Sequence, residues 1–205
     1  MDWHYKKGMA ATTLNQNNKV QKPYKQKEQF SMSEMEWGVN SDTNTTFMNF
    51  EFDIDSLYST IVKIDYLVRV NPKKDINLRI ASYGGDVYAM LGLCDYIRGL
   101  DVKVNTHCVG TCMSAAAVLL ACGTGNRTMT RHSTVMVHEG SAVEIGKSTD
   151  VMRGVDHLKE LQKDINILLS EVTKKDTKFW TRVNRNDTYW DADKCLEYGL
   201  IDTII

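Results

Sequence analysis

One serine stands in a run of small and apolar residues, VGTCMSAAAVLLACG, at residues 109–123. A buried helix would ordinarily carry another alanine there, because serine competes with its own backbone for hydrogen bonds and favours helix starts. Ser114 follows an expected strand and the Gly110 turn, and it opens an expected helix. Unpaired N–H groups and the helix dipole favour an anion at such a point, which suits a nucleophilic serine. A serine that only caps the helix is the alternative interpretation.

A histidine and an aspartate supply the two side chains that a serine nucleophile needs beside it. His138 ends the apolar strand TVMVH, where a strand edge can aim an imidazole sideways as a base. Asp187, in the turn NRNDTYW, is of the type that orients and stabilises an imidazolium. Each has a structural alternative, a hydrogen-bonded core histidine and a turn-forming aspartate. The other histidines are His4, His107, His132 and His157, of which His107 is expected inside a strand.

A double glycine, Gly84 and Gly85 in SYGGD, falls between an expected strand and an expected helix. Two glycines let a backbone N–H approach a substrate oxygen without obstruction by a side chain. The stretch matches neither of the common glycine-rich phosphate loops, so a nucleotide site has little support. The run HCVGTC brings His107, Cys108 and Cys112 close together, but no second cysteine pair completes a tetrahedral site. Buried thiols and no bound metal are therefore expected.

Strands and helices alternate from residue 47 onwards. Apolar residues recur at helical spacing over 54–68, and 76–81, 102–109 and 133–138 have the composition of strands. This alternation predicts an α/β domain built from right-handed crossovers. A one-sided apolar stripe from Val151 to Val172, with Ser148 or Thr149 as candidate N-cap, predicts a helix of roughly 33 Å. Such a helix either projects onto another subunit or lies on its own core. The remaining elements are expected as helices near 177–183 and 191–199, a turn at 184–190 and a strand at 200–205.

Composition separates residues 1–46 from residues 47–205. The first segment is rich in Asn, Gln, Lys, Ser and Thr and has no sustained periodicity, which predicts a polar arm that is flexible or held by a partner. The whole chain has 25 basic and 26 acidic residues, so no overall field favours nucleic acid or an anionic membrane. Five cysteines, an odd number, favour a reducing compartment. No secretory signal and no apolar run of about 20 residues is present, so a cytoplasmic protein is expected, with a plastid stroma or a phage-infected host cell left open.

The motifs occur in the order of a known family. The succession NPKKDINLRIASYGGDVYAMLGLCDYI, VGTCMSAAAVLLACGTGNR, STVMVHEG, GKSTDV and NDTYWDADKCLEYGLID resembles the proteolytic subunit of the Clp protease. The family's double-glycine turn falls on residues 82–85, its nucleophile on Ser114, its base on His138 and its acid on Asp187. This sequence departs from the family at Tyr83, Met113 and Glu139-Gly140, which bears on the substrate channel and leaves the triad residue types unchanged.

The resemblance implies a ClpP/crotonase-like fold of repeated β-β-α units with a long projecting handle helix. It implies a serine endopeptidase in which the N–H groups of Gly85 and Ala115 form the oxyanion hole. It further implies a homo-oligomer of two stacked heptameric rings, an AAA+ Clp unfoldase partner and unfolded polypeptide substrates. No cofactor is expected in this chain, since the unfoldase uses the ATP. Two alternatives remain open, a crotonase-like acyl-CoA enzyme or binder and a non-catalytic ring subunit.

Overall fold

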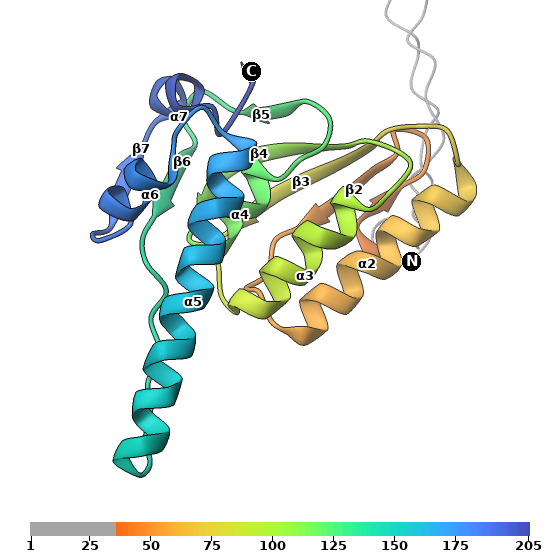
Figure 1. The fold of residues 1–205 in the computed structure, drawn as a ribbon. Helices are drawn as coiled ribbons and strands as arrows, with labels where there is room; N and C mark the ends of the chain where they lie inside the picture. Colours follow the sequence, from red (N-terminus) through yellow and green to blue (C-terminus); the bar gives the residue numbers. More distant parts are fainter. Residues whose placement is uncertain (1–35) are drawn as a thin grey trace, which may run out of the picture. The chain divides into compact units, whose positions relative to one another are not determined.

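The computed structural model describes residues 36–205, in which strands and helices alternate (Figure 1). Eight strands of this part of the chain form one sheet: β1 (Val39–Asn40), β2 (Thr45–Met48), β3 (Ile76–Ser82), β4 (Val104–Met113), β5 (Arg127–Met129), β6 (Thr134–Val137), β7 (Thr188–Trp190) and β8 (Thr203–Ile204). The helices between them are α2 (Ile54–Val70), α3 (Val87–Arg98), α4 (Ala115–Ala121), α5 (Ser148–Val172), α6 (Thr177–Val183) and α7 (Ala192–Tyr198). The expected α/β class is confirmed.

Parallel pairing forms the centre of the sheet. The strand order is β1-β2-β3-β4-β5-β8, and β6 pairs with β4 and with β7. Pairing is antiparallel only between β1 and β2 and between β6 and β7, among the described strands. Parallel neighbours need crossover connections, which the helices provide. The carboxyl ends of the parallel strands therefore meet at one edge of the sheet, where α/β proteins commonly place their sites.

β4 changes its partner at Gly110, whose φ of 86° is in the left-handed region. The residues before the bend, Thr106–Cys108, pair with β5, and the residues after it, Thr111–Met113, pair with β6. Ser133 holds the bend, because its hydroxyl accepts a hydrogen bond of 2.7 Å from the Gly110 N–H. The bend directs the end of β4 toward β6.

Helices α2, α3, α4 and α5 follow one another across one face of the sheet (Figure 1). All seven residues of α4 are buried, which explains its AAAVLLA sequence, since small side chains permit close packing on every side. Alternate residues of β3, namely Ile76, Leu78 and Ile80, are fully buried. The core thus lies between the sheet and this row of helices.

α5 extends away from the sheet at its N-terminal half (Figure 1). Its buried residues, Ile165, Asn166, Leu168 and Leu169, all lie in the C-terminal half. The long helix and its projection are as predicted. Ile165 and Leu168, however, pack into the core of their own chain, so they have little surface left for contact with another subunit.

The folded part begins before residue 47, where the sequence places the boundary of the polar arm. β1 and the first half of β2 lie within 39–46, and Thr46 is fully buried. A hydrophobicity pattern does not reveal this part, because buried polar residues such as Thr45 and Thr46 contribute to it. Asn44, between the two strands, is also buried, and its amide donates to the carbonyls of Lys74 and Asp75 at 3.0 Å each. Residues 1–35 of the expected arm lie outside the described residues. Within 36–205, no helix has both the length and the apolar character needed to cross a bilayer.

Candidate active site

Strand register brings Ser114, His138 and Asp187 together. Met113 pairs with Met136 in the parallel β4–β6 ladder, so Ser114 leaves β4 beside the end of β6. In the antiparallel β6–β7 ladder Val137 pairs with Thr188, and the next positions in the same register are His138 and Asp187. Three side chains far apart in the sequence therefore meet where these strands end.

Ser114 has an unusual backbone conformation, with φ 53° and ψ −122°, at a sharp turn from β4 into α4. Few non-glycine residues adopt positive φ, and strain of this kind gathers at functional sites. The turn is held by the Ser114 N–H, which donates to the Met136 carbonyl at 2.8 Å. The Ser114 side chain makes no capping hydrogen bond to α4. Ser114 thus occupies the N-cap position of α4, but its hydroxyl does not cap the helix.

The Ser114 hydroxyl instead contacts His138. Ser114 Oγ lies 2.8 Å from His138 Nε2, a normal hydrogen-bond length. On the other side of the ring, Nδ1 lies 3.4 Å from Asp187 Oδ1. That second separation exceeds a well-formed hydrogen bond, as often occurs before a substrate is bound. The His138 side chain is 26% exposed and that of Asp187 is 63% exposed, so the site opens to solvent.

The double glycine lies against the serine. A Cβ at Gly84 would come within 2.7 Å of Ser114 Cβ, and a Cβ at Gly85 within 2.4 Å of the Phe52 carbonyl oxygen. Both glycines have positive φ, 105° and 137°. Among the described residues, neither Gly85 N–H nor Ala115 N–H donates a hydrogen bond. The N–H groups of Gly85 and Ala115 are thus two backbone donors without a partner in the described part of the chain.

The other described histidines do not contact Ser114. His107 lies in β4 as expected, and its Nδ1 is 2.5 Å from Thr128 Oγ1. Burial, with the nearby charge of Arg79, lowers the pKa of His107. His157 Nε2 lies 2.8 Å from the Tyr88 hydroxyl. His4 is outside the described residues.

The five cysteines are buried free thiols, as predicted. Burial raises the pKa of Cys195 to about 12 and holds the pKa of Cys112 well above its usual range. A buried thiol of high pKa is a poor nucleophile and a poor metal ligand. Within residues 36–205 no group of three or more His, Cys, Asp or Glu side chains is placed to hold a metal ion.

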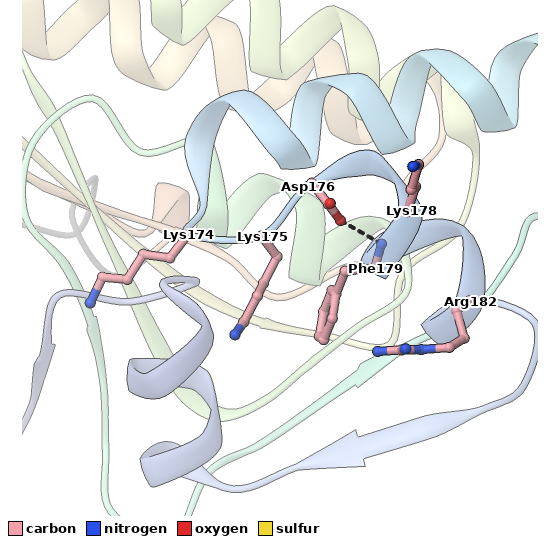
Figure 2. Close-up of a pocket in the computed structure, with 6 residues that line it drawn as sticks. All are labelled: Lys174, Lys175, Asp176, Lys178, Phe179 and Arg182. Carbon is pink, nitrogen blue, oxygen red and sulfur yellow. Dashed lines mark hydrogen bonds between the residues drawn. The ribbon is translucent and has the colours of Figure 1, made fainter.

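A shallow hollow lies where α5 passes into α6, lined by Lys174, Lys175, Asp176, Lys178, Phe179 and Arg182 (Figure 2). Asp176 caps α6 by accepting a 2.8 Å hydrogen bond from the Phe179 N–H. Lys175 Nζ lies 4.6 Å from the ring centre of Tyr198. The lining contains no hydroxyl, thiol or imidazole, so it offers no pair of nucleophile and base.

Sequence reasoning missed a set of buried and half-buried amide side chains next to this site. Gln162 and Asn166 on α5 and Asn184 after α6 hydrogen-bond to one another and to the residues that follow His138. A signal for two of them was present, because Gln162 and Asn166 are polar residues one turn apart on the side of α5 that packs on the core.

Comparison with known proteins gives the class. The family model described as Clp protease matches residues 38–205. The ATP-dependent Clp protease proteolytic subunit 2 of Chlamydia pneumoniae is 35% identical over 148 residues, which cover 72% of this chain and 73% of that protein. The ATP-dependent Clp protease proteolytic subunit 1 of Prochlorococcus marinus is 32% identical over 160 residues, which cover 78% and 82%. The chain belongs to the Clp protease family, and it is a serine peptidase of the Clp type.

Proposed function

We propose that this chain hydrolyses peptide bonds by covalent catalysis at Ser114, with His138 as general base and acid and Asp187 as the partner of the imidazole. One observation carries the assignment. Ser114 Oγ, on a strained turn and not engaged in capping, lies 2.8 Å from His138 Nε2. A serine is a weak nucleophile until an adjacent base can take its proton.

The chemistry has two halves. Ser114 Oγ attacks the peptide carbonyl carbon while His138 Nε2 takes the hydroxyl proton, and the carbonyl oxygen becomes an oxyanion. The N–H groups of Gly85 and Ala115 stabilise that charge. When the C–N bond breaks, the imidazolium returns the proton to the leaving amine, and an acyl-serine ester remains. A water molecule then attacks the ester by the same route and releases Ser114. Asp187 stabilises the imidazolium in both halves.

Nucleophile, base and oxyanion donors all come from this chain, so the proposed reaction needs no cofactor and no metal in it. The relatives are subunits of ATP-dependent proteases by name. We infer that this chain likewise receives unfolded polypeptide from an AAA+ Clp unfoldase, which uses the ATP. We also infer a homo-oligomer of two stacked heptameric rings in the cytoplasm, without nucleic acid or membrane as a partner.

A fluorophosphonate probe tests the function. We expect the wild-type protein to be labelled at Ser114 and to cleave a fluorogenic peptide, and Ser114→Ala to lose both. An enzyme that has lost a triad member retains a rate only about 10³- to 10⁴-fold above that of the uncatalysed reaction in water. Ser170→Ala is the matched control, because that hydroxyl donates to the Ile167 carbonyl of its own helix. A Ser114→Ala protein that cleaves as fast as wild type would falsify the assignment. A crotonase-like protein would not react with the probe.

A further inference from the structure

Three amide side chains form a hydrogen-bonded group between α5 and α6. Asn166 Oδ1 is the centre, because it accepts from Gln162 Nε2 at 3.1 Å and from Asn184 Nδ2 at 2.9 Å. Asn166 Nδ2 also lies 3.3 Å from Thr181 Oγ1 on α6. Asn166 and Asn184 are 6% and 3% exposed. Gln162, Asn166 and Asn184 are called the amide group below.

One side of the amide group holds the chain directly after His138. The Glu139 N–H donates to the Asn184 carbonyl at 2.5 Å. The Gly140 N–H donates to Gln162 Oε1 at 2.8 Å. The two residues that follow the histidine are therefore fixed by two members of the same group, which limits how far the imidazole can move.

The other side holds the loop that carries Asp187. Asn184 ends α6, where its N–H donates to the Trp180 carbonyl at 2.9 Å, and Asp187 comes three residues later. β7 begins at Thr188, opposite Val137. Any shift of Asn184 thus acts on both sides of the contact between His138 and Asp187.

The amide group stabilises the fold less than apolar side chains of similar shape would. Asn184 Oδ1 is buried and has no hydrogen-bond partner among the described residues. A buried acceptor without a partner is unfavourable, whereas apolar side chains of similar shape would avoid that loss. What the amides provide, and apolar groups do not, is a directional tie between two helices and the strand end at His138.

We propose that Gln162, Asn166 and Asn184 are positioning residues that set the separation between His138 and Asp187. The inference rests on the proposed function, since it assigns a role in the same reaction. None of the three lies in the triad or the proposed oxyanion hole. Gln162 and Asn184 bind the backbone N–H groups of residues 140 and 139, and Asn166 joins the two. The position of α5 thereby affects how well His138 is placed to act as the base.

Two alanine variants of the full chain test the proposal, Asn166→Ala and Gln162→Ala. We expect kcat for a fluorogenic peptide to fall about tenfold or more while KM changes less than about twofold, because misplaced catalytic groups cost rate and not binding. We also expect the acid limb of the kcat/KM profile to move to lower pH, because a more distant Asp187 stabilises the imidazolium less. A purely structural role would not move that limb in folded protein.

Two further variants complete the set. Gln162→Glu keeps an acceptor for the Gly140 N–H but loses the donor to Asn166 Oδ1, so it should recover only part of the rate that Gln162→Ala loses. Asp164→Ala, at an exposed position of the same helical turn, should behave as wild type. Thermal unfolding and sedimentation establish that each variant folds and assembles. If Asn166→Ala does not fold, the comparison of Gln162→Ala with Gln162→Glu tests the proposal.

Wild-type kcat and an unmoved acid limb in folded Gln162→Ala would overturn the proposal. So would an equal loss in Gln162→Ala and Gln162→Glu. Fluorophosphonate labelling of the wild-type protein distinguishes failure of the proposed function from failure of the positioning role. If the probe does not label Ser114 in wild type, the proposed function fails. If it does and the variants are normal, only the positioning role fails.

Discussion

At the scale of single residues, the site depends on backbone conformations that most residues avoid. Ser114 has positive φ without being glycine, and Gly84 and Gly85 also have positive φ, with Gly84 directly against Ser114. Such a conformation costs of order 1–3 kcal/mol at a non-glycine residue. The ladder on β6 offsets that cost, because the Ser114 N–H is bonded to Met136 at the end of a regular register.

Gly84→Ala should lose activity because the new methyl group would meet Ser114 Cβ at 2.7 Å and the Met113 carbonyl oxygen at 2.8 Å. We expect kcat/KM to fall about 100-fold, the effect of misplacing a reacting group by about 1 Å. Gly99→Ala is the control, because φ is −86° there and the nearest atom would lie at an ordinary 3.5 Å. Peptide assays on both proteins check this, and normal activity in Gly84→Ala would contradict the described turn.

The pH profile of kcat/KM should rise from acid pH toward neutrality, since the base accepts a proton only as a neutral imidazole. The measurement is initial rate against pH at low peptide concentration, with thermal unfolding followed in parallel to exclude loss of folded protein. A flat profile from acid to mildly alkaline pH would argue against His138 as the base.

At the scale of elements, Arg127 on β5 joins the ends of α4 and α5 to the segment before β8. Its Nη1 donates to the carbonyls of Ala121 at the end of α4 and Val172 at the end of α5, at 3.2 and 2.6 Å. Its Nη2 donates to Asp202 Oδ1 at 2.6 Å, just before β8. A single, mostly buried guanidinium therefore fixes two helix ends relative to the sheet edge.

Asp202→Asn should weaken this tie in a pH-dependent way. The hydrogen bonds from Arg127 hold the pKa of Asp202 below its usual range. A carboxylate with a lowered folded pKa contributes stability above its unfolded pKa and loses it as pH falls through the folded pKa. We expect a loss of at most about 1 kcal/mol at pH 7, because the carboxylate is partly exposed and screened by solvent. Urea unfolding at fixed protein concentration should show the difference from wild type shrinking below about pH 4. A difference that grows on acidification would contradict this.

At the scale of the whole molecule, several large apolar side chains are exposed and do not contribute to the core. α2 carries five of them at intervals of four residues, namely Ile54, Tyr58, Val62, Tyr66 and Val70. Exposed apolar side chains gathered on one element commonly mark an interface. Because Ile165 and Leu168 on α5 are buried in their own chain, the exposed side chains of α2 are better candidates for contact between subunits.

Tyr58→Lys together with Tyr66→Lys should shift the protein to smaller assemblies, because two charges would be buried without partners in a packed interface. Sedimentation velocity at micromolar concentration measures this, and peptide cleavage follows the loss. Tyr189→Lys, at an exposed tyrosine of β7, is the matched control. If wild type sediments as a fully active monomer, the proposed ring assembly is wrong.

Local pattern determined the helices, and local pattern together with resemblance to a family determined the candidate residues. The apolar periodicity of α2 and α5 repeats within one segment, so it predicts a helix without any knowledge of the packing partner, although Ile54 and Tyr58 on α2 are exposed. Ser114, His138, Asp187 and the two glycines were recognised from type, order and resemblance to the family.

Only the tertiary structure decided the pairings. β5 and β7 are three residues long and carry no periodic signal, while β1 and the first half of β2 lie in the segment whose composition predicts a polar arm. Asp187 was expected in a turn, yet the β6–β7 register places it opposite His138. The hydrogen bonds of Asn184 and Asn166 join residues of separate helices. Strand partners and buried polar contacts are chosen by competition among distant segments for the same hydrogen bonds and core space, and that competition leaves no trace in the local sequence.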